Sequence, residues 1–206
     1  PNGSLAWQHR NAGSDGIGVT TDAANNAMVL THTFNGRDVD LDLISMDQAQ
    51  GLTQWRSTES PITGLGESPC CVGATAEFLT ANGDAIVLGS RDDNQQGAAI
   101  VSRFSAAGDL LWTRSVGTCP PATSVGVGAY AVDPAGQTYV LVQADVPGVP
   151  GTLLKLDGDG QELWQRELPN QPISMFDRYS LLIDDSGDGV LFAGRAIAVC
   201  ADYFRV

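Results

Sequence analysis

The sequence predicts an all-β fold, and three observations carry this prediction. Short runs rich in Val, Ile, Leu and aromatic residues alternate with turns rich in Asn, Asp and Gly, which is the pattern of antiparallel hairpins. No segment keeps a sustained helical period. Four segments that end in Gly-x-x-x-Trp hold all the tryptophans and recur about every 50 residues, which marks a repeat architecture. They are Gly3–Trp7, Gly51–Trp55, Gly108–Trp112 and Gly160–Trp164.

Each repeat is predicted to contain four strands. In the second repeat, Glu77-Phe-Leu79 precedes the polar turn Thr80–Asp84, and a second apolar run follows, Ala85-Ile-Val-Leu88. A variable polar loop then leads to a third strand and to the strand that carries the tryptophan. Four antiparallel strands per unit are typical of a β-propeller blade. We therefore predict one domain over residues 1–206, a four-bladed β-propeller. Its blades span approximately residues 16–56, 74–114, 128–166, and 178–206 together with 4–10.

The fourth blade is expected to take its outermost strand from the N-terminus. Phe204-Arg-Val206 followed by Pro1–Trp7 repeats the pattern of Lys155–Trp164 with one turn residue fewer. Closure by residues 4–10 would remove the free edges of the ring. A chain cut from a longer array at the same point of the repeat would show the same phase, so both alternatives stay open.

Two of the repeats resemble known families. Leu156-Asp-Gly-Asp-Gly-Gln-Glu-Leu-Trp-Gln-Arg166 resembles the repeat of bacterial PQQ-like propellers, in which a hairpin turn leads to Gly-x-x-x-Trp. Asp133-Pro-Ala-Gly-Gln-Thr-Tyr-Val140 is similar to the secreted bacterial β-propeller repeat. The resemblance implies a propeller fold and no single activity, because such propellers serve as scaffolds, adhesins, assembly factors and enzymes. Four blades, as in hemopexin-like domains, is a low number for propellers, so the chain could also be half of a larger ring.

Composition excludes several classes of protein. The chain has 206 residues, with 24 acidic and 11 basic side chains, for a net charge of −13, which argues against nucleic-acid binding. An apolar fraction of 43% excludes disorder, and no apolar run reaches the ~18 residues of a membrane span. The chain opens at Pro1 without an initiator Met, so we expect a removed signal peptide or a longer parent chain.

The four cysteines favour an extracytoplasmic, oxidising location. They are Cys70, Cys71, Cys119 and Cys200. Disulfides that restrain long loops would pair Cys119 with Cys70, Cys71 or Cys200. A second arrangement is a vicinal Cys70–Cys71 bond beside a Cys119–Cys200 bond, and that adjacent pair resembles the one in quinoprotein alcohol dehydrogenases. A thiolate metal site is the third alternative, although no Cys-x-x-Cys spacing supports it.

The binding surface is expected at the end of the sheets where the long, variable loops lie, because such loops on a rigid frame usually carry binding. Asp38, Asp40 and Asp42 alternate along one strand, and with Asp92 and Asp93 they could line an acidic rim for a cation. The simpler explanation is that they are solvated charges at a strand end, which discourage edge pairing. Exposed aromatics such as Phe176 and Tyr203 would serve a glycan.

Other chemistry finds little support. Asp184-x-Ser186-x-Asp188-Gly189 begins like a calcium loop, but Arg195 stands where an EF-hand has its bidentate Glu, so no cofactor is predicted and calcium stays a minor alternative. His9 and His32 lie in no nucleophile motif. We predict an extracytoplasmic binding or interaction module, part of a larger surface or secreted protein, with a protein or glycan partner at the loops. A carbohydrate-binding lectin, or a quinoprotein-like or hydrolytic enzyme, is the alternative.

Overall fold

The computed structural model describes residues 7–8, 14–35, 38–62, 73–80, 82–92, 97–116, 125–144, 149–168, 179–183, 190–194 and 203–205. These residues form antiparallel strands in four sheets, and none of them is helical. The all-β prediction is therefore confirmed. The hairpins predicted around the polar turns are also present, since β1 pairs with β2, β5 with β6, and β9 with β10.

Each sheet is built from one stretch of the chain, with its strands side by side in chain order. The first sheet contains β1 (Ser14–Thr21), β2 (Ala27–Asn35), β3 (Asp38–Met46) and β4 (Thr53–Ile62). The second contains β5 (Gly73–Leu79), β6 (Ala85–Asp92), β7 (Gly97–Phe104) and β8 (Leu110–Val116). The third contains β9 (Val125–Val132), β10 (Thr138–Ala144), β11 (Thr152–Leu156) and β12 (Glu162–Glu167). The fourth contains β13 (Tyr179–Ile183), β14 (Val190–Gly194) and β15 (Tyr203–Arg205).

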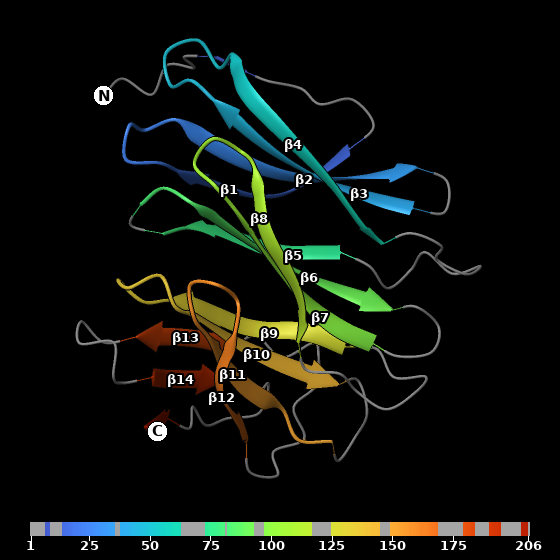
Figure 1. Cartoon of the computed structure of the whole chain (residues 1–206), viewed down its shortest axis with the longest axis vertical. Helices are drawn as coiled ribbons and strands as arrows, with labels where there is room; N and C mark the ends of the chain where they lie inside the picture. Colours follow the sequence, from blue (N-terminus) through green and yellow to red (C-terminus); the bar gives the residue numbers. More distant parts are fainter. Residues whose placement is uncertain are drawn as a thin grey trace.

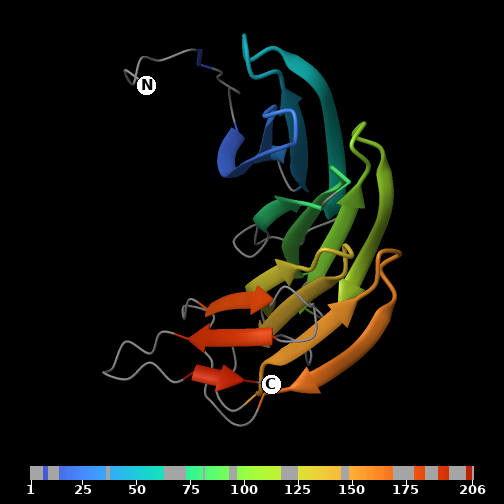
Figure 2. The ribbon, with the colours of Figure 1, turned by 90° about the vertical axis from the view of Figure 1, so that its left-hand side faces the viewer.

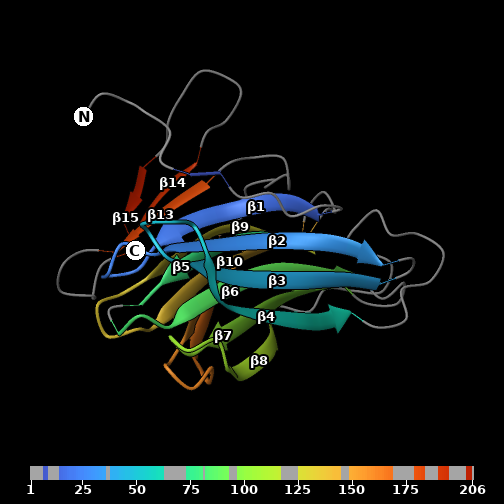
Figure 3. The ribbon, with the colours of Figure 1, turned by 90° about the horizontal axis from the view of Figure 1, so that it is seen from above.

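The sheets stack face to face in chain order along the long axis of the molecule (Figure 1). The first strands of successive sheets lie close together, with β1 against β5 and β9 against β13. The last strands, β4, β8 and β12, lie along the opposite, outer side of the stack (Figure 2). Viewed from above, β1 to β4 run side by side across the first sheet (Figure 3). Every sheet thus has an inner edge and an outer edge.

Apolar side chains fill the spaces between neighbouring sheets. Between the second and third sheets, Leu88 and Val101 meet Val140 and Leu154, all of them fully or almost fully buried. On the other face of the third sheet, Leu141 packs in a separate cluster that includes residues of β13. This follows from the period of two in a strand, because alternate residues of β10 point to opposite faces. A strand buried on both faces carries a nearly continuous apolar run, as Tyr139-Val-Leu-Val142 does.

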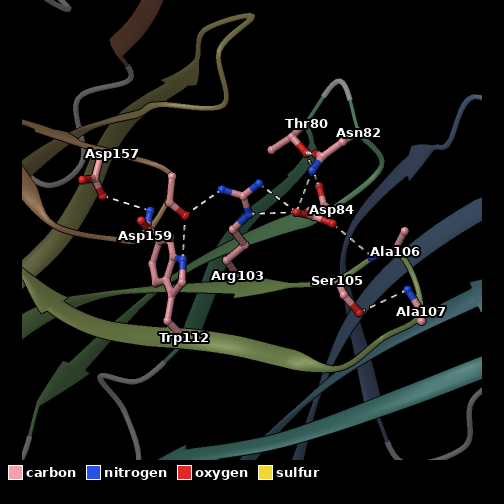
Figure 4. Close-up of polar contacts among 11 residues, drawn as sticks. Thr80, Asn82, Asp84, Arg103, Ser105, Ala106, Ala107, Trp112, Asp157 and Asp159 are labelled. Atoms are coloured by element: carbon pink, nitrogen blue, oxygen red, sulfur yellow. Dashed lines mark hydrogen bonds and ion pairs between the residues drawn. The ribbon is translucent and has the colours of Figure 1, made fainter.

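A polar link joins the second sheet to the third at the end where the tight turns lie (Figure 4). Arg103 on β7 donates from Nε and Nη2 to Oδ2 of Asp84, at 3.0 and 2.7 Å. Its Nη1 donates to the carbonyl of Gly158 in the third sheet at 2.7 Å. Trp112 Nε1 donates to the same carbonyl at 2.9 Å. The Gly158 carbonyl therefore accepts hydrogen bonds from two side chains of the preceding sheet.

The expected closing strand is not formed among the described residues. Trp7 and Gln8 are in no strand, and the rest of residues 4–10 lies outside the described part of the chain. The first and fourth sheets stand at opposite ends of the stack, so the described sheets form an open arc and not a closed ring (Figures 1 and 2). The angle between neighbouring sheets depends on the side chains packed between them, and the sequence pattern along a strand does not set that angle.

Candidate functional site

The two ends of the sheets differ in how the strands are connected. At one end, on the left of Figure 1, the turns are short and nearly identical. Oδ1 of Asp22, Asp133 and Asp157 each accepts the backbone N–H four residues later, in every case at 2.8 Å. Glycine or Asn25 supplies the positive φ that these turns require. The short turns therefore hold the strands in register and offer no variable surface.

The connections at the other end have different lengths and sequences. Those within a sheet join Asn35 to Asp38, Asp92 to Gly97 and Ala144 to Thr152, and those between sheets join β4 to β5, β8 to β9 and β12 to β13. In Figure 1 this end lies on the right for the first two sheets. We call it the loop end. The expectation that both classes of loop share one end is met by the described strands.

Three of the predicted acidic residues lie at the loop end. Asp38 begins β3, Asp40 follows it, and Asp92 is the last residue of β6 in the next sheet. Asp38 pairs with Asn35 and Asp92 with Gly97, so each flanks a connection within its sheet. Tyr203 begins β15 in the fourth sheet. The other predicted residues lie outside the described part of the chain, namely Asp93, Phe176, Cys70, Cys71, Cys119 and Cys200.

Asp42 does not belong to an acidic rim. Its side chain is only 1% exposed and its Oδ1 accepts hydrogen bonds from Arg56 Nε at 2.9 Å and from Thr58 Oγ1 at 2.6 Å. Arg56 Nη2 forms an ion pair with Oδ2. The hydrogen bond to Asp42 raises the pKa of Arg56, with help from the negative charge, and burial opposes this. Asp42 is therefore committed to a structural ion pair and is not available to a cation.

Gln143 is a buried polar residue that sequence reasoning missed. It lies on β10 next to its loop end, where it pairs with Gly126, and it is 1% exposed. Neither Oε1 nor Nε2 has a hydrogen-bond partner. Its side chain covers Gly128, where a Cβ atom would lie 2.4 Å from Cδ of Gln143. The only signal in the sequence is that an amide directly follows the apolar run Tyr139–Val142.

A polar groove of about 720 Å³ separates the outer strands of the second and third sheets. Arg114 and Ser115 line one side, on β8. Gln165 and Glu167 line the other, on β12. Arg114 donates from Nη1 to the carbonyl of Thr113 at 3.1 Å. The described residues that line the groove include one basic side chain, Arg114, and two acidic ones, Glu162 and Glu167, together with uncharged polar groups.

Within the described ranges, no three His, Cys, Asp or Glu side chains form a group that could hold a metal ion. The same residues contain no helix that is long and apolar enough to cross a membrane.

Comparisons with known proteins assign no family to the chain. No family model matches the chain, and no curated protein matches it either. Among solved structures, the chain is similar to regucalcin, a calcium-binding protein from Agrobacterium tumefaciens strain C58. The identity is 12%, the match covers 86% of this chain and 81% of regucalcin, and the TM-score is 0.28. A similarity of this size assigns neither a fold nor a ligand to this chain.

Proposed function

We propose that the chain is an extracytoplasmic β-propeller module that binds a protein or glycan partner at its loop end. In this proposal the four stacked sheets are the blades. The observation that carries it is the contrast between the two ends, since the turn end repeats one hydrogen-bonded turn while the loop end varies from sheet to sheet. A rigid frame that presents variable loops on one side is a common design for recognition.

The described packing supports a rigid frame. Leu88, Val101, Val140 and Leu141 are each 0% exposed, so the faces between the sheets are well filled. The strand ends at the loop end, in contrast, carry polar residues such as Asp38, Asp40 and Asp92. The extracytoplasmic part of the proposal rests on the four cysteines and on the acidic composition.

The test replaces the loop sequences and leaves the strands intact. Residues 63–72 and 117–124 are each replaced by a Gly-Ser linker of the same length, because these segments cross from the outer edge of one sheet to the inner edge of the next. Far-UV circular dichroism checks that the sheets still form. Wild-type and grafted proteins are then applied to a glycan array and to a panel of purified extracellular proteins. The matched control exchanges the turn Asp133–Gln137 at the opposite end for the turn Thr80–Asp84.

The outcomes separate the candidate functions. Binding that is lost in the loop graft and kept in the turn exchange supports the proposal. Binding to glycans alone would identify a lectin. Binding that survives the loop graft would place the site elsewhere and contradict the proposal. Reduction of a redox dye by the wild type with added PQQ would favour the enzyme alternative.

A further inference from the structure

The groove between β8 and β12 follows these two outer strands along their length. Gly160 and Gln161 line it at the turn end, and Val116 and Glu167 line it where the strands end. Its volume of about 720 Å³ is typical of sites that hold a ligand. Both strands lie on the outer side of the stack (Figure 2). The described lining residues therefore form an elongated site that belongs to strands and a tight turn, not to the variable loops.

Arg114 on β8 differs from other basic residues in its contacts. Three of them form ion pairs with aspartates of their own unit, namely Arg56, Arg103 and Lys155. Arg114 instead donates from Nη1 to the backbone carbonyl of Thr113 at 3.1 Å. A guanidinium has five N–H donors. Among the described contacts of Arg114, most of this capacity, and the charge itself, is left for a ligand in the groove.

The stem of Arg114 is held by the next sheet. Its Cγ lies 3.1 Å from the position of a Cβ atom on Gly160, a glycine with a φ of 75° in the turn before β12. Trp112 covers the same glycine and donates from Nε1 to the carbonyl of Gly158 at 2.9 Å. Alternate residues of a strand point to the same face, so Arg114 follows Trp112 into the space between the sheets. The guanidinium is thus half-buried at a fixed place in the groove.

The opposite wall of the groove carries two carboxylates. Glu162 begins β12 and Glu167 ends it, and both line the groove. Arg114 and Arg166 each lie two residues after the tryptophan of their strand, and these tryptophans pair with equivalent positions of the third strands. Arg114 is therefore level with a point between the two glutamates. Along the groove the charges follow the order negative, positive, negative.

We propose that this groove binds an extended peptide in which one acidic residue stands between two basic ones, in the pattern basic-x-acidic-x-basic. The acidic side chain pairs with Arg114, and the basic side chains pair with Glu162 and Glu167. Alternate residues of an extended chain point to the same side at intervals of roughly 7 Å, so all three charges face the groove. Ser115 and Gln165 line the groove as well and can bond to peptide N–H and C=O groups.

The spread of the charges favours a peptide over a compact zwitterion. β12 has six residues, so its two glutamates are separated by roughly 16 Å along the strand. A five-residue extended segment with lysine side chains at its ends spans this length. β8 and β12 also each have one edge without a neighbouring strand among the described residues, where a peptide main chain could pair. The proposal does not depend on the partner proposed for the loop end.

The experiment measures peptide binding by fluorescence anisotropy. The probe is Lys-Ser-Asp-Ser-Lys, acetylated, amidated and labelled with tetramethylrhodamine, and the control peptide is Asp-Ser-Ser-Lys-Lys with the same composition and net charge. The test variant is Arg114→Glu. Its matched control is Arg166→Glu, which makes the same change of charge two residues after Trp164, where the guanidinium lies 5.6 Å from the indole. Circular dichroism checks the fold of both variants.

We expect the wild type to bind the probe about fivefold more tightly than the control peptide, because only the probe matches the order of charges. Arg114→Glu should weaken binding of the probe about tenfold, and Arg166→Glu by less than about twofold. Arg114→Gln, which removes the charge without adding a carboxylate, should weaken it about fivefold and serves if Arg114→Glu does not fold.

Two results would overturn the proposal. Equal affinity of the wild type for both peptides would show that the order of charges in the groove is not recognised. Equal weakening by Arg114→Glu and Arg166→Glu would show that the probe responds only to the overall negative charge of the protein.

Discussion

Among the described residues, a tryptophan packed against a glycine joins the first sheet to the second and the second sheet to the third. The glycine serves in two ways, since it adopts a positive φ that other residues avoid and it leaves space for the indole. Gly108 under Trp55 shows both, with a φ of 92° and a Cβ position 2.6 Å from the ring. Gly83, in the same sheet, has a φ of 86°, but the nearest atom to its Cβ position is 3.5 Å away.

These two glycines allow the two effects to be separated. Gly108→Ala should lower the free energy of unfolding by about 2–4 kcal/mol, because backbone strain and overpacking against Trp55 add together. Gly83→Ala should lower it by only about 1–2 kcal/mol, since strain acts alone. Urea denaturation measures both. If both variants lose the same free energy of unfolding, the close packing of Trp55 against Gly108 is contradicted.

Replacement of Gln143, in contrast, should increase the free energy of unfolding. Its buried amide has no hydrogen-bond partner, so Gln143→Met should raise the free energy of unfolding by about 1 kcal/mol by removing an unsatisfied polar group of similar size. The control is Gln165→Met at an exposed position on β12, which should change stability little. A loss of stability in Gln143→Met, measured by thermal denaturation, would show that the amide is satisfied in solution.

The turn aspartates make stability depend on pH. Asp47 accepts backbone N–H groups of Gln50, Leu52 and Ala49 at 2.8, 2.7 and 3.0 Å, and these bonds lower its pKa from 3.8, with the Gln50 bond contributing most. Because the folded-state pKa is the lower one, the unfolded chain binds the proton more readily. The stabilisation is therefore present well above pH 3.8 and is lost as the pH falls below it.

Asp47→Asn should reduce this acid sensitivity. We expect its melting temperature to fall less than that of the wild type when the pH is lowered from about 5 to about 3, because the variant has no proton to take up at this position. Asp22 should behave in the same way, since hydrogen bonds from Asn26 and Ala24 together outweigh burial and lower its pKa. If the melting temperatures of the wild type and of Asp47→Asn fall equally as the pH is lowered, the hydrogen bonds to the Asp47 carboxylate do not persist in solution.

At the scale of the element, β7 connects the second and third sheets through Arg103. The guanidinium and the carboxylate of Asp84 are 11% and 13% exposed, so the pair is well shielded from water. Thr80 and Asn82 complete the network around Asp84 in the β5–β6 turn (Figure 4). In the third sheet Lys155 stands at the position of Arg103, and its Nζ lies 3.8 Å from Oδ2 of Asp133. Asp133 begins its turn as Thr80 does, so the basic residue is repeated but its acidic partner comes from another position of the turn.

Arg103→Gln should lower the free energy of unfolding by about 3 kcal/mol, because it leaves the shielded Asp84 carboxylate without its cation and removes one of the two donors to the Gly158 carbonyl. Arg103→Gln combined with Asp84→Asn should recover part of the loss, since no buried charge then remains unpaired. A double-mutant cycle in urea measures the coupling. A coupling energy near zero would mean that the two groups stabilise the protein independently.

At the scale of the whole molecule, each sheet contacts its neighbours in the stack. Among the described residues, a large buried cluster lies between the second and third sheets and includes Ile86, Leu88, Val140 and Leu154. The outer strands contribute less, since Leu110, Leu111 and Leu163 are each about half exposed. The arc should therefore be most stable in its middle and near its inner edge.

Hydrogen exchange followed by mass spectrometry tests this gradient. Amides of β6, β7, β10 and β11 should exchange slowest, because they lie in paired strands around the main cluster. Amides on the free edge of β12 should exchange faster. Uniform protection across the second and third sheets would mean that they open as a single cooperative unit.

The sequence by itself determined the local structure. Alternation of apolar residues and the Asp- and Gly-containing turns act over a few residues, so the hairpins of the first three units could be read directly, as in Glu77–Leu88. The Gly-x-x-x-Trp repeat also marked Trp55 and Trp112 as equivalent residues, and each packs against a glycine of the next sheet. Cys70, Cys71, Cys119 and Cys200 lie outside the described residues, so their pairing stays a prediction.

Only the tertiary structure decided which polar residues are buried and how far the stack curves. Nothing in the pattern of Asp38, Asp40 and Asp42 shows that the third carboxylate is enclosed by Arg56 and Thr58, because those residues come from the next strand. The open arc likewise depends on residues that are brought together from different strands. The angle between two sheets is set by the summed volumes of side chains from several strands, and a periodic pattern along one strand does not contain that sum.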